Sequence, residues 1–480
     1  MLYPKSYIEF RRGGSSRSGV LALQIGRRSA TQSMYAVSSF SNGAAESLAC
    51  SVQSCIENVF FRAFVLIAGE TATDGEPFAG VIGSAMVRQL LEGRGSLGGR
   101  KLRSVIEQSF AGVSSAPRSL GVAVVTTTSV SCEAIGPSKA YLYDYGTQDL
   151  VVGEMPVYGK RGYLCVSSQP LHQDRLNDLR SLSYSAGFPD DILGVLSRRI
   201  PANEDLAISL MAMAAPFNRS ALSGTARKRR IACVSDVGRV RKNNEDTAFA
   251  ASIWYSFYGA QIHGYVIGVA DGAGGHGAGE VASRTAASEV LPKVVEGFSN
   301  SATDPSALSL REIIMTTNQG VMARKTSIGS DMVTTLTLAR FIRVNGTETL
   351  DVGHVGDSRA YLVDRGSGQI LRLTEDHKLV DDLVRTGELT PEQARFHPQR
   401  NIITSALGMP EPRVDVSQPV SLHPTGSVLV CSDGLSDLVE DTEIARVVRA
   451  SPGPNRAAVT LKNLANSRGG RDNVSIAAMF

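Results

Sequence analysis

The sequence predicts an α+β protein, or a sandwich of sheets, rather than a parallel doubly wound fold. Short apolar runs bounded by glycines and acids follow one another closely in the second half of the chain, as strands do. The helical stretches separate clusters of these runs, whereas a doubly wound fold alternates single strands with single helices.

The predicted elements of the second half begin with a buried strand that runs into a glycine-rich turn. Apolar runs predict strands over 264–271, 334–344, 349–356, 427–433 and 472–480, and a strand, turn and strand over 359–373. Helical stretches lie at 278–298, 309–325 and 456–467. Several of the strands end or begin beside an acidic residue.

The composition is that of a packed globular protein. Of 480 residues, 42% are hydrophobic and 20% charged, and this length favours about three domains or two larger ones. Lys and Arg number 49 against 46 Asp and Glu, a net charge of +3. A protein that binds nucleic acid usually carries a strong basic stripe, so we expect no nucleic-acid partner. No cysteines have CxxC spacing, which argues against a thiolate zinc site or a disulfide framework.

Membrane and export signals are missing from the sequence pattern. No apolar run reaches the ~18 residues that a membrane span needs, and the first residues, MLYPKSYIEFRRGG, lack the apolar core of a secretory signal. We therefore expect a cytoplasmic protein with no membrane partner.

The stretch 218–230 separates two units. It is rich in small polar residues and ends in four consecutive cations, which are Arg227, Lys228, Arg229 and Arg230. We expect a solvated basic linker between a unit at 1–217 and a unit at 231–480, although such a charge run would also suit an acidic partner.

Acidic residues stand at four strand ends of the second unit. Asp271 and Asp433 each follow an apolar strand, Asp472 precedes one, and Glu245 and Asp246 precede another. Each alone would be an ordinary turn or helix cap. Together at one sheet edge they would repel unless a cation neutralised them, and carboxylates suit Mg²⁺ or Mn²⁺. Two such ions ~3.5–4 Å apart lower the pKa of a shared water and stabilise an in-line displacement at phosphorus.

Six motifs in the second unit occur in the order of a known family. They are Arg241 with 244–246, and the segments 271–283, 355–362, 373–380, 431–437 and 469–473. In these motifs the unit 231–480 resembles the bacterial type of the PP2C (PPM) family of metal-dependent Ser/Thr protein phosphatases, and 383–408 resembles the family's flap. The resemblance implies an α-β-β-α sandwich of two antiparallel sheets flanked by helices, with metals at the edge of the sandwich.

The resemblance also implies roles for individual residues. Asp271 would bridge two metal ions and Gly272 would offer its carbonyl oxygen. Asp433 and Asp472 would hold one ion and Glu245 or Asp246 the other, while Asp331 lies near a third, weaker metal site. Arg241 would grip the substrate phosphate, and a metal-activated water would attack phosphorus without a phosphoenzyme.

Some positions depart from the family pattern. Ala273 follows Asp-Gly where relatives have Met or His, and His276 stands three residues further on, so the general acid is left open. Val333 replaces a glycine near Asp331, and His377 is expected to be structural.

One rival interpretation uses the same glycine-rich loop. Gly272, Gly274 and Gly277 spell the dinucleotide fingerprint GxGxxG. Asp271 would repel a pyrophosphate there, and no acid-terminated strand follows ~20 residues later, so this interpretation is not favoured.

The first half resembles the same family faintly, which predicts two tandem copies of the fold. Segment 134–146 matches 354–366 without a gap, and other blocks keep the same order. In this alignment Ser39 stands for Asp271, Ser167 for Asp433 and Pro137 for Asp357, and only Glu204 keeps an acid, opposite Asp472. We therefore expect 1–217 to be a metal-free pseudophosphatase domain that binds a partner, or pairs with or gates the catalytic domain.

The leading hypothesis is a phosphatase that acts on phosphorylated proteins and works with a Ser/Thr kinase or another regulator. The alternative is a signalling scaffold with little catalysis. Four acids held together at one edge favour the enzyme, because a scaffold has no need of them.

Overall fold

The computed structural model describes residues 34–42, 45–71, 78–96, 102–110, 117–126, 130–144, 149–152, 162–185, 206–215, 229–257, 260–274, 278–300, 309–344 and 347–480. Within these ranges no helix is both long and apolar enough to cross a bilayer. All six cysteines lie in the described ranges and are free.

In the part of the chain that the structure describes, the strands form three sheets, and every ladder between named strands is antiparallel. A ten-stranded sheet has the order β18-β15-β14-β12-β11-β2-β3-β4-β5, with β13 pairing with β12. The other two sheets are five-stranded, with the orders β10-β20-β19-β16-β17 and β1-β9-β8-β6-β7. Antiparallel pairing of β12 with β11 and β14 contradicts the parallel βαβ unit that a dinucleotide fingerprint requires, and Gly277 lies outside the described residues.

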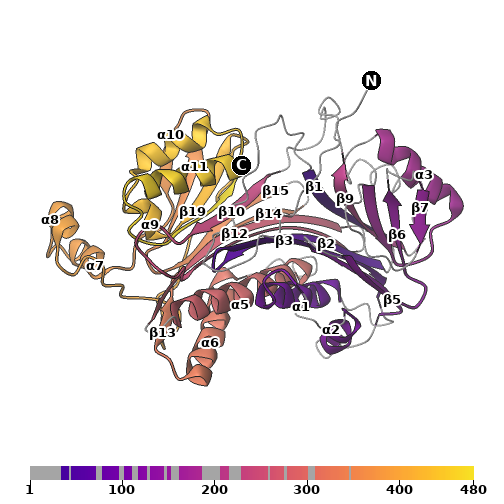
Figure 1. Ribbon diagram of the computed structural model, residues 1–480, viewed down its shortest axis with the longest axis horizontal. Helices are drawn as coiled ribbons and strands as arrows, with labels where there is room; N and C mark the ends of the chain where they lie inside the picture. The colour runs from indigo at the N-terminus through magenta and orange to yellow at the C-terminus, as the bar shows by residue number, and fades with distance from the viewer. Residues whose placement is uncertain are drawn as a thin grey trace, which may run out of the picture.

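The strands of the ten-stranded sheet come from both halves of the chain. They are β2 (Ala45–Ile56), β3 (Val59–Glu70), β4 (Ser119–Val125), β5 (Val130–Ile135), β11 (Asp246–Phe257), β12 (Ala260–Gly274), β13 (Met332–Thr334), β14 (Leu336–Val344), β15 (Thr347–Val355) and β18 (Asp415–Val416). Helices α1 (Ala79–Glu92), α2 (Leu102–Ser109), α5 (Ala278–Asn300) and α6 (Leu310–Ile328) cover one face of this sheet (Figure 1).

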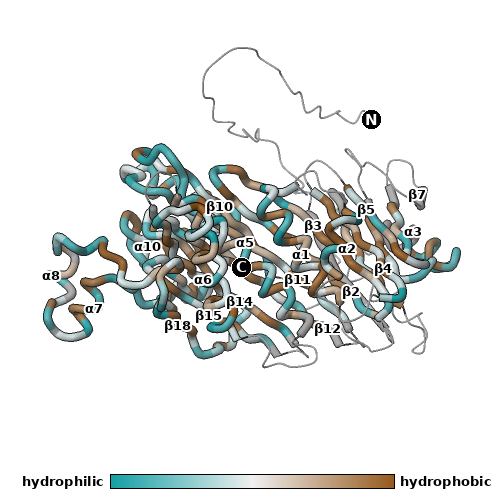
Figure 2. Tube along the Cα trace, turned by 90° about the horizontal axis from the view of Figure 1, so that it is seen from below, coloured by the Kyte–Doolittle hydropathy of each residue, from teal (hydrophilic) through white to brown (hydrophobic). Residues whose placement is uncertain are grey.

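The two smaller sheets lie on the opposite face of the large sheet, one toward each of its ends (Figure 1). One contains β1 (Met34–Asn42), β6 (Lys139–Asp144), β7 (Asp149–Val152), β8 (Gly162–Ser167) and β9 (Leu206–Ala215), with α3 (Gln173–Ser185) outside it. The other contains β10 (Ile231–Asp236), β16 (Arg359–Asp364), β17 (Ile370–Arg372), β19 (Gly426–Cys431) and β20 (Val474–Met479). Its outer side carries α9 (Asp433–Ser436), α10 (Asp441–Ala450) and α11 (Pro454–Ser467), while α7 (Leu379–Arg385) and α8 (Pro391–Phe396) project from the body (Figure 2).

The strands and helices predicted for the second half are confirmed, with boundaries that shift by a few residues. The expectation of a solvated linker is wrong for Arg229. Its guanidinium donates to the carbonyl of Gly426 at 2.9 Å and lies over the ring of Phe341, and only 8% of the side chain is exposed. Residues 218–228 of that stretch lie outside the described residues.

The first half repeats the element order of the second half. The order β1-β9-β8-β6-β7 parallels β10-β20-β19-β16-β17, and β2-β3-β4-β5 parallels β11-β12-β14-β15. In the large sheet the two sets run outward from a shared boundary, where β2 pairs with β11.

The structure corrects two pairings of the sequence alignment. Arg118 N donates to Glu70 O in the first half as Thr335 N donates to Asp271 O in the second, so Glu70, and not Ser39, occupies the place of Asp271. Ser39 lies in β1, the counterpart of β10.

The place of Asp433 is likewise taken by a different residue from the one predicted. Ser167 lies opposite Lys139 as Cys431 lies opposite Arg359, so the counterpart of Asp433 is Gln169. Glu204 lies outside the described residues.

The junction between the halves is a strand ladder backed by a shared apolar core. β2 and β11 pair from Ile56 opposite Thr247 to Glu46 opposite Phe257. Behind them the buried side chains of α1 and α5 belong to one cluster with those of β2 and β11, including Leu48, Ile82 and Val295. Because apolar burial is the main stabilising term of folding, this continuity makes the halves one packed unit.

A buried carboxyl lies in this junction. Glu46 on β2 accepts hydrogen bonds from the Tyr255 hydroxyl of β11 at 2.6 Å and from Phe78 N at 2.7 Å. Burial raises the pKa of Glu46 to about 7, so the folded state keeps this carboxyl protonated at mildly acidic pH, where an exposed Glu would be ionised.

Glu46→Gln is expected to remove a pH dependence of stability. The folded pKa lies above the unfolded value, so the wild type is more stable when Glu46 is protonated and loses on the order of 3 kcal/mol as pH rises through the window between the two pKa values. The glutamine amide of the variant cannot ionise, so the variant loses no stability over this pH window. Thermal unfolding at about pH 5 and about pH 8 checks this: the melting temperature of the variant should gain on the wild type at the higher pH. Parallel shifts in the two proteins would contradict the assignment.

Candidate active site

The acids predicted at strand ends meet at one edge of the second half. Asp246 opens β11 and lies opposite Asp271 on β12 in the strand register. Asp433 begins α9 directly after β19, and Asp472 stands two residues before β20. Antiparallel pairing therefore brings together residues that lie far apart in the sequence.

Burial and mutual repulsion raise the proton affinity of these carboxyls. The pKa of Asp271 is raised well above its usual range, first by burial and then by the charges of neighbouring carboxylates, which are Asp246, Asp433, Asp357 and Asp472. Burial raises the pKa of Asp246 to about 6 and that of Asp433 to about 8. The carboxyls of this site therefore cannot all ionise together without a cation to offset their charge.

The donor set fits a hard divalent cation. Asp246 is buried, and its Oδ2 accepts a hydrogen bond from Ser432 at 2.8 Å, while its Oδ1 has no hydrogen-bond partner. A buried carboxylate oxygen without a partner is costly, and an oxygen-ligating cation would supply one. Among the described residues, no three acidic, His or Cys side chains are arranged closely enough around one point to hold a metal ion.

The backbone at the Asp271 turn is packed tightly against its neighbours. Gly272 N donates to Glu245 O, and a Cβ on Gly272 would stand 2.0 Å from Gly279 O and 2.7 Å from Glu245 O. Only glycine fits this contact. A Cβ on Gly279 would lie 2.8 Å from the Glu245 carboxyl carbon, so the side chain of Glu245 lies beside the first turn of α5.

Two asparagines hold the acid-bearing segments. Asn473 accepts from Glu245 N at 2.8 Å, and its amide donates to the carbonyls of Val237 and Asn243. Asn244 accepts from Asp246 N at 3.2 Å. These side chains use the hydrogen-bonding groups of an otherwise irregular backbone.

Arg241 lies at the rim of the site. Its guanidinium donates to Asp472 Oδ2 at 2.7 Å, and 53% of its side chain is exposed. A guanidinium in this position can bind the oxygens of an anion that enters from solvent.

Comparison with known proteins addresses the family. A family model described as "Protein phosphatase 2C" matches residues 255–465. The serine/threonine phosphatase stp of Listeria welshimeri is 33% identical over 245 residues, which is 50% of this chain and 92% of that protein. The chain belongs to the protein phosphatase 2C family.

Other phosphatase 2C relatives give a similar coverage. Protein phosphatase PhpP of Streptococcus pneumoniae serotype 2 is 30% identical over 247 residues, which is 52% of this chain and 95% of PhpP. The solved structure of the Mycobacterium tuberculosis serine/threonine phosphatase PstP/Ppp is 32% identical and covers 52% of this chain and 97% of its own, with a TM-score of 0.43. Because about half of this chain already covers 92% and 95% of the two curated relatives, little of either relative is left to correspond to the other half of this chain.

Sequence reasoning gave no role to two charged residues of this phosphatase 2C site. Asp357 is buried beside Asp271 and Asp433 and pairs with Lys378, with 2.8 Å between Nζ and Oδ2. Asp357 follows the strand that ends at Val355, so the strand-end rule that selected Asp271 would also have found it. A single lysine such as Lys378 carries no comparable signal in the sequence.

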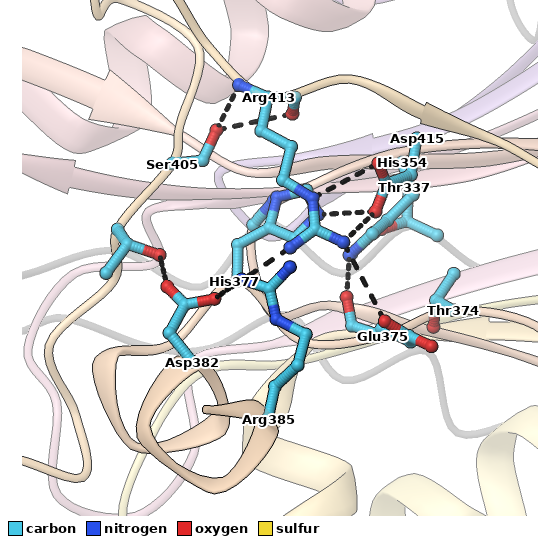
Figure 3. Close-up of polar contacts among 12 residues, drawn as sticks. Thr337, His354, Thr374, Glu375, His377, Asp382, Arg385, Ser405, Arg413 and Asp415 are labelled. Carbon is cyan, nitrogen blue, oxygen red and sulfur yellow. Dashed lines mark hydrogen bonds and ion pairs between the residues drawn. The ribbon is translucent and has the colours of Figure 1, made fainter. Parts of the chain in front are cut away.

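The histidines near the flap are engaged within the protein (Figure 3). His377 is fully buried; its Nδ1 accepts from Gly356 N at 3.1 Å, and its Nε2 donates to Asp415 at 3.0 Å. The ring of His354 lies 4.7 Å from that of His377 at an angle of 56°, and its Nδ1 is hydrogen-bonded to Thr337 Oγ1 at 2.7 Å. Both ring nitrogens of His377 are thus occupied, as a structural role requires.

The remaining positions that the sequence singled out are Asp331, Val333 and His276. Asp331 stands just before β13, with 93% of its side chain exposed, and pairs with Lys325 at 2.5 Å. Val333 faces Ala273 across the β13–β12 ladder, and His276 lies outside the described residues.

Proposed function

We propose that the protein is a metal-dependent phosphoprotein phosphatase that hydrolyses phospho-Ser and phospho-Thr at the acidic edge of its second half. One observation carries this proposal: a buried group of carboxyls, with a partnerless oxygen on Asp246, lies at that edge. Membership of the phosphatase 2C family, and relatives named serine/threonine phosphatases, support the reaction class.

Mg²⁺ or Mn²⁺, two per catalytic half, is the proposed cofactor. The proposed ligands are the Asp271 carboxylate and the Gly272 carbonyl, with Asp433, Asp472 and either Glu245 or Asp246. When bound, such ions supply a water of lowered pKa and stabilise charge at phosphorus. The fully buried Asp246 fits a direct ligand better than Glu245, which stands beside α5. Exposed Asp331 stays outside the proposed two-ion set.

The chain's own residues position the substrate and stabilise the site. Arg241, at the rim and half exposed, would bind the phosphate oxygens of the phosphoprotein and orient them for in-line attack. Buried Lys378 offsets the charge of Asp357, which limits the repulsion that Asp433 experiences. No side chain is assigned as the general acid.

We propose that the first half, 1–217, is a non-catalytic domain of the same ancestry. Support comes from its repeated strand order and from the contact at the place of the acids, where Gln169 Nε2 donates to Glu70 Oε1 at 2.6 Å. In the second half the matching positions are two carboxylates. Here the Gln169 amide occupies the Glu70 carboxylate with a hydrogen bond. A site for a divalent cation would instead need a second anionic oxygen at that position.

A Ser/Thr kinase or another regulator is the proposed partner of the first half. The scaffold alternative, in which catalysis is secondary, is disfavoured by the intact acids of the second half.

Metal removal tests the proposed reaction. The full chain is expected to release phosphate from a phosphothreonine peptide when Mn²⁺ is present and to lose this activity when EDTA removes the metal, with recovery on adding Mn²⁺ back. Phosphate release is measured colorimetrically. Hydrolysis that persists in EDTA, or no hydrolysis at any Mn²⁺ concentration, would reject the metal-dependent phosphatase.

A further inference from the structure

A turn from the first half reaches the acidic site of the second. Strands β2 and β3 are joined by Glu57 and Asn58, whose φ values of 49° and 66° place both residues in the left-handed region. Two left-handed residues between paired strands make the tight hairpin turn that matches strand twist. Ile56 faces Thr247 in the β2–β11 ladder, so the turn lies next to the start of β11, where Asp246 stands.

The side chain of Asn58 completes the hydrogen bonding of Asn244. Asn244 is 3% exposed. Its Nδ2 donates to Asn58 Oδ1 at 2.9 Å and to Ser235 Oγ at 2.7 Å, while its Oδ1 accepts from Asp246 N at 3.2 Å. All the hydrogens of this amide are therefore used, and its orientation is fixed by one partner from each half.

The neighbouring side chain holds the helix that lies beside Glu245. Glu57 pairs with Arg284 of α5 and with Arg94 after α1, each at 2.5 Å. Thr247 next to Asp246 also contacts Ser283 of α5 at 3.0 Å. The turn thus contacts the segment 244–246 through Asn58 and helix α5 through Glu57.

We propose that Asn58 is a positioning residue for the metal site of the other half, acting through Asn244 on the backbone of Asp246. The inference rests on the proposed function for the identity of the site. The first half then contributes directly to the geometry of the acids, although it holds no complete acid set of its own. Relatives that match over one half of this chain have little length left to supply such a turn.

Asn58→Gly in the full chain tests this inference, because glycine keeps the left-handed turn and removes only the amide. Loss of one hydrogen bond to Asn244 should raise the Mn²⁺ concentration for half-maximal activity, and the Mn²⁺ dissociation constant measured by calorimetry, about threefold to tenfold. Asn58→Asp restores the acceptor and tolerates the same turn, so it should restore Mn²⁺ binding.

Arg88→Gln is the matched control. It breaks the ion pair between α1 and Glu289 of α5, a junction contact outside the contacts described for the acids, and should leave Mn²⁺ binding unchanged. Wild-type Mn²⁺ binding in Asn58→Gly, no recovery in Asn58→Asp, or an equal shift in Arg88→Gln would each overturn the inference. If the wild type binds Mn²⁺ but hydrolyses no phosphopeptide, the proposed function fails while calorimetry still decides the role of Asn58. A wild type that binds no Mn²⁺ overturns both.

Discussion

Asp271→Asn is expected to lower Mn²⁺-dependent hydrolysis of p-nitrophenyl phosphate by at least about a hundredfold, because changes even behind a metal's direct ligands cost tenfold to a hundredfold. The amide keeps the shape of the side chain and removes the charge that two cations would share. Burial and four neighbouring acids already disfavour the Asp271 carboxylate. The variant should therefore melt at or above the temperature of the metal-free wild type.

If activity is lost while the melting temperature is retained, the loss cannot be due to misfolding. Asp364→Asn is the matched control, since Asp364 also ends a strand but is only partly buried and accepts hydrogen bonds from Gly366 N and from the hydroxyls of Ser367 and Thr425. It should keep wild-type hydrolysis. Unchanged activity in Asp271→Asn would reject the assignment of the acids to catalysis.

A chain truncated to 229–480 is expected to associate into symmetric dimers. Truncation removes β2 and leaves the β11 edge of the large sheet unpaired, and unpaired apolar edges recruit other strands. It also uncovers Trp254, which packs in a cluster with Ala49 and Leu66 of the first half. Because the first half repeats the strand order of the second, a second copy of β11 is suited to the place of β2, which gives an isologous contact.

Light scattering after size-exclusion chromatography measures this association. The full chain, whose β11 is covered, is the reference state. Trp254→Lys in the truncated chain places a charge on the free edge and should return it to a monomer. An unmodified truncated chain that stays monomeric at every concentration would contradict the prediction.

The acids of the second half could be predicted from the sequence because their signal is local. Asp271 and Asp433 follow apolar strands directly, and a turn after a strand places its residue at a sheet edge. The choice between Glu245 and Asp246 could not be made in this way, since it depends on which side chain faces the strand that bears Asp271.

Other features depend on contacts that no sequence window contains. Ser39 was paired with Asp271 through shared small residues, whereas the backbone hydrogen bond of Glu70 to Arg118 identifies the true counterpart. The pairing of β2 with β11 was also unpredictable, because both are apolar strands and nothing local distinguishes an edge that is joined from one that is free.

The shared sheet restricts how a signal can travel through the molecule. A hinge rotation of one half would break the β2–β11 ladder and open the apolar layer between α1 and α5. The two halves therefore cannot rotate far relative to each other while the protein stays folded. A ligand on the first half would instead act by altering the twist or curvature of the common sheet. Through the proposed role of Asn58, a small displacement of the Glu57–Asn58 turn would change the affinity of the site for metal.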